Sequence, residues 1–75
     1  MQNPTYGVVL FHSTQVAIKA EKILKGAGIK IKLIPVPRHL SSDCGICLRF
    51  EFKDASVVES ILESKNIKTA GIHQL

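Results

Sequence analysis

Cys44 and Cys47 are the side chains of this sequence best suited to covalent chemistry, and only Gly45 and Ile46 separate them. A Cys-x-x-Cys pair near a βαβ pattern can form a redox dithiol, as in thioredoxin-like motifs. Here the pair leads into a strand, in which positions i and i+3 point to opposite faces. We therefore favour a single reactive Cys44 over an internal dithiol. A third interpretation stays open, in which both cysteines are small apolar residues without chemistry.

The surroundings of Cys44 are those that a reactive thiol requires. A thiolate is the nucleophile in sulfur exchange, and nearby positive charge or a helix N-terminus favours it over the thiol. Cys44 stands in a polar segment after two basic side chains, and the glycine that follows it permits close backbone approach. We expect the sulfur to be bound and stabilised by residues of this segment and of the segment after the first strand: Arg38, His39, Ser41, Ser42, Gly45, His12 and Ser13.

Other kinds of site are poorly supported. His12, His39, Asp43 and Cys44 could supply mixed metal ligands, but the second closely spaced ligand pair typical of zinc sites is missing from the sequence. A glycine-rich phosphate loop and a Ser-His-Asp order are also missing. We therefore predict neither a metal nor a cofactor.

Hydrophobic periodicity predicts the elements that position Cys44. Alternating or short apolar runs indicate strands at 6–11, 29–34 and 46–52, and a weaker one at 67–73. Helical spacing predicts one helix from Ser13 or Thr14 to about residue 26. The Ser-x-x-Glu pattern at 56–59 has the form of a capping box, with Asp54 as a competing cap, and predicts a second helix to about Lys65.

The order β-α-β-β-α-β predicts an α+β fold of the ferredoxin-like type. We expect a four-stranded antiparallel sheet in the order 4-1-3-2 with both helices on one face. In this topology the first two strands run the same way and the third runs back. The connection 35–45 should therefore lie at the same end of the molecule as His12, Ser13 and Thr14.

Length and composition limit the possible functions. A chain of 75 residues, 45% hydrophobic and 21% charged, predicts one domain over 1–75 with one core and no deep cleft. The net charge of +4 is uneven, with six bases and one acid in 1–42 but four bases and five acids in 43–75. Two cysteines, no stretch long enough to span a membrane and no signal-like start predict a cytoplasmic protein.

Several segments together resemble the family of selenium/sulfur carrier protein-like chains. They are Phe11-His12-Ser13-Thr14, Ala20-Glu21-Lys22-Ile23-Leu24-Lys25, Ile34-Pro35-Val36-Pro37-Arg38 and Ser41-Ser42-Asp43-Cys44-Gly45. The resemblance extends from the first strand through the third, and its most specific part is Pro-x-Pro-Arg followed by Ser-Ser-x-Cys-Gly. It implies a small carrier that holds sulfur or selenium on Cys44, and it leaves Cys47 outside the motif.

The leading hypothesis is therefore a carrier rather than a stand-alone enzyme. Cys44 would take a persulfide or perselenide from a protein donor such as a cysteine desulfurase and pass it to an acceptor enzyme. One alternative is a nucleic-acid-binding module like the RNA recognition motif, which shares this strand order. We do not expect it, because Phe50 and Phe52 should face the core rather than stack on bases. The other alternative is a regulatory or interaction subunit, such as a homodimer paired through sheet edges.

Overall fold

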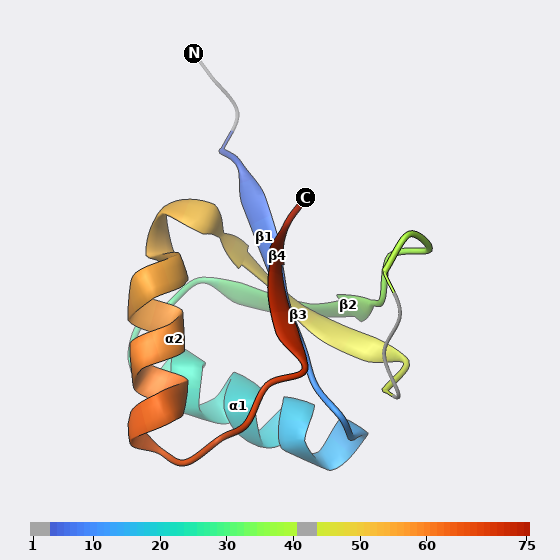
Figure 1. The fold of residues 1–75 in the computed structure, drawn as a ribbon. Helices are drawn as coiled ribbons and strands as arrows, with labels where there is room; N and C mark the ends of the chain where they lie inside the picture. Colours follow the sequence, from blue (N-terminus) through green and yellow to red (C-terminus); the bar gives the residue numbers. More distant parts are fainter. Residues whose placement is uncertain (1–3, 41–43) are drawn as a thin grey trace.

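Four strands and two helices follow one another in the predicted β-α-β-β-α-β order. The computed structural model describes residues 4–40 and 44–75. Its elements are β1 (Tyr6–Leu10), α1 (Thr14–Gly26), β2 (Ile31–Pro35), β3 (Ile46–Glu51), the 3₁₀ turn η1 (Phe52–Asp54), α2 (Ala55–Ser64) and β4 (Gly71–Gln74) (Figure 1).

The sheet has the order β2-β3-β1-β4, with every neighbouring pair antiparallel. This is the predicted order 4-1-3-2 counted from the opposite edge. Both helices cover the same face of the sheet (Figure 1). The core between the two layers is made by side chains from α1, α2 and the two central strands: Ala17, Ala20, Leu24, Val58, Leu62, Val9, Leu48 and Phe50. The α+β fold predicted from the sequence is confirmed.

Helix α1 begins where the sequence predicted. Ser13 has extended backbone angles, and its hydroxyl oxygen accepts a hydrogen bond from the Val16 amide at 3.2 Å. This satisfies one of the amides that the first turn of a helix leaves without a partner. The helix ends at Gly26, and Gly28 then adopts a left-handed φ of 82° that a glycine tolerates without strain.

The face that each strand residue presents follows the predicted alternation. Leu48 and Phe50 point toward the helices, whereas Lys30 and Lys32 are exposed. Phe50 lies opposite Gly7 in the register between β1 and β3. A side chain at Gly7 would approach the Phe52 ring to 2.6 Å, so the glycine makes room for the aromatic pair beside β1. Phe50 and Phe52 therefore face the core, as predicted.

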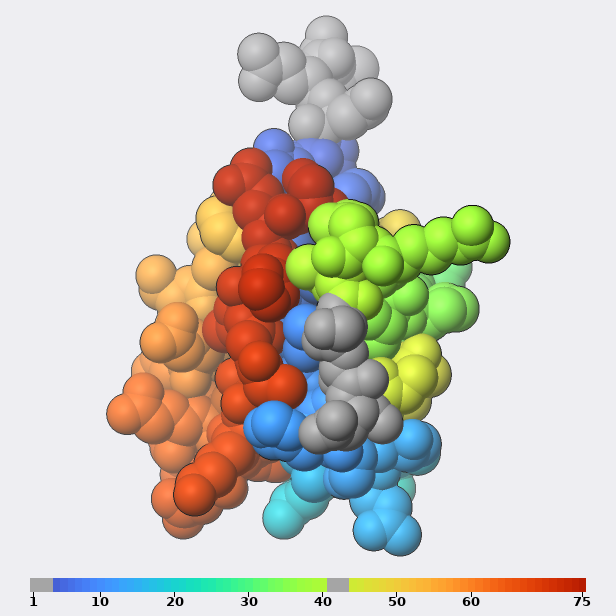
Figure 2. Space-filling model, turned by 45° about the vertical axis from the view of Figure 1, so that its right-hand side comes forward, coloured from blue at the N-terminus to red at the C-terminus, as the bar shows by residue number. Residues whose placement is uncertain are grey.

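Part of the sheet face opposite the helices is also covered. Val8, Leu10 and Cys47 form a small buried cluster there, each no more than 2% exposed. Side chains from the end of β2, from the following loop and from the segment before β4 pack against it: Ile34, Val36, Leu40 and Ala70. Figure 2 shows residues 36–40 in light green beside the red atoms of β4. The loop after β2 thus folds back over the sheet.

Several boundaries differ from the sequence prediction, among them the starts of β2, α2 and β4. The capping box at 56–59 is wrong, because α2 already begins at Ala55. The competing cap Asp54 occupies the capping position, but its side chain makes no capping hydrogen bond. The chain enters this helix through η1. The Phe52 amide donates a hydrogen bond to the Thr5 carbonyl oxygen at 2.8 Å, and this bond anchors η1 to the start of β1.

The last strand is shorter than the predicted 67–73, because it begins only at Gly71. Asn66 takes a left-handed φ of 58° after α2, and Ile67 is buried in the core without joining the sheet. The following residues carry the chain across to β1, where the Ala70 amide bonds the Leu10 carbonyl at 2.7 Å.

Candidate functional site

Cys44 and the start of α1 meet at one end of the molecule, as the topology predicted. The Sγ atom of Cys44 lies 3.6 Å from Oγ1 of Thr14, within hydrogen-bond range for sulfur, although 30 positions separate the two residues. Thr14 is the first residue of α1. The thiol therefore stands beside the first turn of a 13-residue helix.

This end of α1 favours negative charge. Unpaired amides of the first turn and the helix dipole together place partial positive charge there, equivalent to roughly half an elementary charge. The first turn of α1, which is fully described, contains no acidic side chain to cancel that field. Ser13 occupies the capping position, so its hydroxyl group serves the helix. An anionic sulfur on Cys44 would face a hydroxyl group and this positive helix end.

Cys44 is buried, although the sequence places it in a polar segment. Its side chain is 3% exposed and belongs to the core cluster under the helices. The reason is the alternation of β3, because Cys44 shares the parity of Ile46 and Leu48 and continues their inward-facing row by one step. Gly45, between these positions, is exposed and has open space where a side chain would project.

Cys47 is set apart from Cys44, as its place in the strand predicted. It packs with Val8 and Leu10 on the sheet face opposite the helices, and neither cysteine forms a disulfide. The Cys47 thiol donates to the Pro35 carbonyl oxygen at 3.9 Å. Burial, followed by the charge of Cys44, raises the pKa of the Cys47 thiol. Cys47 is therefore the less suitable nucleophile of the two.

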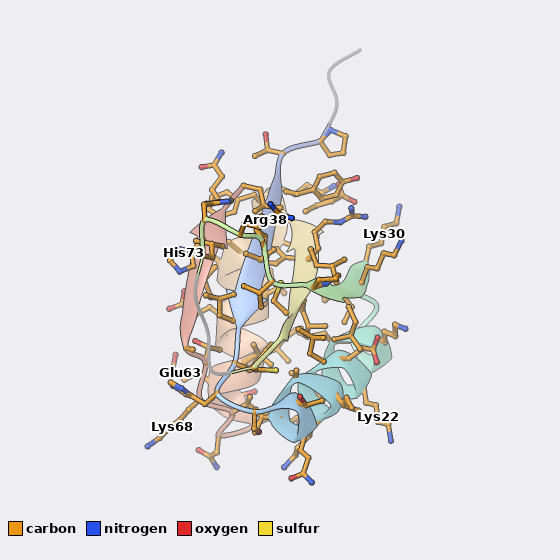
Figure 3. All side chains as sticks on the ribbon, turned by 90° about the vertical axis from the view of Figure 1, so that its right-hand side faces the viewer. Lys22, Lys30, Arg38, Glu63, Lys68 and His73 are labelled. Atoms are coloured by element: carbon orange, nitrogen blue, oxygen red, sulfur yellow. The ribbon has the colours of Figure 1, made fainter. Side chains whose placement is uncertain are left out.

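The other predicted binding residues do not all gather at Cys44. Arg38 is exposed, and Figure 3 shows it near His73 at the level of the C-terminal part of β4, away from the start of α1. The cause is the loop after β2, which turns back over the sheet through Val36 and Leu40. His39 is exposed in the same turn. Ser41 and Ser42 lie outside the described residues.

His12 lies next to the candidate site on the α1 side. Its side chain is exposed and lines a hollow of about 340 Å³ between α1 and the segment after α2. Val16 and Ile67 supply apolar walls, and Lys19 and Lys68 add positive charge. This hollow therefore places positive charge beside the first turns of α1.

Thr14 is the contact residue that the sequence did not single out. Its position suggested only a possible cap for the helix, and Ser13 fills that role. A hydroxyl residue immediately after a capping serine, at the end where the cysteine segment returns, is the signal that could have identified it.

The described residues contain neither a cluster of metal ligands nor a membrane-spanning helix. Within 4–40 and 44–75, no three side chains of histidine, cysteine, aspartate or glutamate are grouped as metal ligands. In the same part of the chain, neither helix has the length and apolar character needed to cross a membrane.

Comparison with known proteins places the chain in a family. It is 34% identical over 62 residues to the uncharacterized protein MJ0011 of Methanocaldococcus jannaschii, covering 83% of this chain and 31% of that protein. It is 41% identical over 39 residues to the uncharacterized protein YtiA of Escherichia coli, covering 52% of this chain and 46% of that one. The chain thus spans less than half the length of both relatives. No solved structure matches it. The model of the family described as "Putative Se/S carrier protein-like" matches residues 6–74, and the chain belongs to this family.

Proposed function

We propose that this protein carries sulfur or selenium on Cys44 between a donor and an acceptor protein. The observation that carries the proposal is the position of the Cys44 sulfur, 3.6 Å from the Thr14 hydroxyl oxygen at the first turn of α1. The family description supports sulfur or selenium as the element carried. A carrier also suits a small fold that has a reactive group at one end, where it can enter a larger partner.

The loading step is a thiol exchange without net oxidation or reduction. The Cys44 thiolate attacks the outer sulfur of a persulfide on the donor, of the kind formed by a cysteine desulfurase. One S–S bond forms between Cys44 and that sulfur, and the S–S bond of the donor breaks. The donor cysteine leaves as a thiolate and takes up the proton that Cys44 gave up. A nucleophile of the acceptor then attacks the outer sulfur, and Cys44 leaves as a thiolate.

Burial of Cys44 gives the carried sulfur protection. A side chain that is 3% exposed is shielded from small thiols in solution, which would otherwise remove the outer sulfur. The exposed Gly45 beside it is where a partner can contact the backbone without meeting a side chain. We propose that a partner reaches the sulfur by displacing the Cys44–Gly45 segment. Two cysteines that form no disulfide fit a reducing compartment such as the cytoplasm.

Intact-mass spectrometry tests this proposal directly. Incubation with a cysteine desulfurase and cysteine should add one sulfur atom to the wild-type protein, and a thiol reductant should remove it once the protein is unfolded in denaturant. Cys44→Ser should abolish the adduct. Cys47→Ala is the matched control, because it removes a thiol from the opposite face of the sheet, and it should load normally. An undiminished adduct on Cys44→Ser, or its loss only in Cys47→Ala, would sink the assignment of Cys44.

A further inference from the structure

The sheet face opposite the helices is divided into a covered half and a bare half. Loop residues close the half that contains Leu10 and Cys47. At the other end, where β1 begins and β3 ends, a hollow of about 320 Å³ remains open. The residues that line it come from β1, β2 and β3 and the approach to β2: Tyr6, Lys30, Ile31, Lys32, Arg49, Phe50 and Glu51.

Strand register brings positive charge to this hollow. Lys32 is paired with Arg49 across β2 and β3, and both lie on the face turned away from the helices. Figure 3, which looks toward this side of the sheet, shows Lys30 at the edge near the start of β2. Glu51 is the acidic side chain of the lining, and it pairs with Lys53 at 3.8 Å. Among the described residues, no carboxylate pairs with Lys30, Lys32 or Arg49.

An aromatic ring lies in the same hollow. The Arg49 guanidinium carbon stands 4.4 Å from the centre of the Tyr6 ring, a cation–π contact. The contact holds the flat guanidinium group against a flat ring, and both residues line the open space. Nucleic-acid bases stack on aromatic rings and on arginine planes of this kind.

We propose that this basic hollow binds single-stranded nucleic acid, with the Tyr6–Arg49 pair as a stacking platform and the cations on the backbone phosphates. An acidic peptide would use the positive charge equally well but would gain nothing from a planar platform. The combination of the two features therefore favours a nucleotide strand. The site is small, and we expect it to accommodate one or two nucleotides.

The residue that could stack on a base differs from those that the sequence offers. Phe50 and Phe52 face the core, as the sequence predicts, and cannot stack. The aromatic residue on the open face is instead Tyr6, which shares the parity of Val8 and Leu10. Tyr6 is available because β1 presents its even-numbered residues to the face without helices.

The number of cations predicts the salt dependence. Single strands lose affinity with a slope of about −0.7 per neutralised phosphate in a plot of log K against log salt. Two phosphate contacts from Lys30 and Lys32 give a slope of about −1.4, and removal of one of these cations should reduce it by about 0.7. Stacking by one base contributes a further factor of roughly five or more in affinity.

Fluorescence anisotropy with a short labelled oligouridylate measures these quantities. Wild-type protein should bind with a slope near −1.4. Lys32→Gln should reduce both the affinity and the slope. Lys22→Gln is the matched control, because it removes one positive charge from α1, away from the hollow (Figure 3). It should change neither quantity. Tyr6→Leu retains an apolar side chain on β1 and should weaken binding about fivefold or more, with an unchanged circular dichroism spectrum.

Three results would overturn the proposal. They are no binding of oligouridylate at low salt, equal effects of Lys32→Gln and Lys22→Gln, and equal binding of an oligoglutamate with the same number of charges. The last result would assign the hollow to acidic proteins. Cys44→Ser should leave oligouridylate binding intact, so that this test and the sulfur-loading test succeed or fail independently.

Discussion

The contact between Thr14 and Cys44 allows a sharp test of how the fold activates the thiol. Thr14→Val replaces the hydroxyl group by a methyl group of similar size, so the side chain keeps its shape and loses only its polar atom. The position is exposed at the start of α1. We therefore expect the free energy of unfolding to change by no more than about 0.5 kcal/mol.

The expected effect on reactivity follows from the geometry. A hydrogen bond to a charged group contributes about 1.5–3 kcal/mol. We use the lower end of that range because Thr14 is exposed to solvent. A loss of about 1.5 kcal/mol corresponds to about a tenfold lower rate constant. Thr14→Val should therefore slow the attack of Cys44 on a persulfide about tenfold, because the anionic sulfur loses its hydroxyl partner at 3.6 Å.

The rate of sulfur loading is measured by intact mass at successive times after addition of a desulfurase and cysteine. Alkylation of Cys44 by iodoacetamide in the Cys47→Ala background gives a second readout that does not depend on the carrier function. Thr14→Ser restores the hydroxyl group and should restore both rates. If Thr14→Val reacts as fast as the wild type, or Thr14→Ser reacts as slowly as Thr14→Val, the hydroxyl group has no part in activating Cys44.

Two further predictions concern stability. Ser13→Ala should lower the free energy of unfolding by about 1 kcal/mol in urea titrations, because the Val16 amide loses its cap at 3.2 Å; an unchanged midpoint would contradict the capping role. Because the pKa of the Cys47 thiol is raised in the folded protein, the unfolded chain loses the thiol proton at a lower pH than the folded chain does, near the ordinary value of 9.0. Wild-type protein should therefore lose stability relative to Cys47→Ala above about pH 9, by up to about 1.4 kcal/mol per pH unit, and parallel pH profiles would refute the burial argument.

Local patterns were sufficient to predict the elements of this fold and the end at which Cys44 lies. Ser13 before a helical repeat predicted α1, and the alternation from Ile46 to Phe50 predicted the faces of β3. The capping box at 56–59 failed because a tertiary contact, the bond from Phe52 to Thr5, determines where the chain turns into α2. A capping motif predicts a helix start reliably where its hydrogen bonds form between adjacent residues, as at Ser13. It is less reliable where backbone groups far away in the sequence bind the same segment, as at Phe52.

The sequence by itself determined the strand and helix order, the separation of Cys44 from Cys47 and the end of the molecule at which the cysteine segment meets the start of α1. These follow from periodicity and from the direction of consecutive strands, which are properties of the chain's own pattern. Only the tertiary structure decided that Cys44 is buried, that Arg38 lies away from it and that Tyr6 and Arg49 share an open hollow. Those features depend on how the loop after β2 packs and on which face of β1 the helices cover. Both are settled by contacts between residues far apart in sequence, where burial of apolar area outweighs local preference.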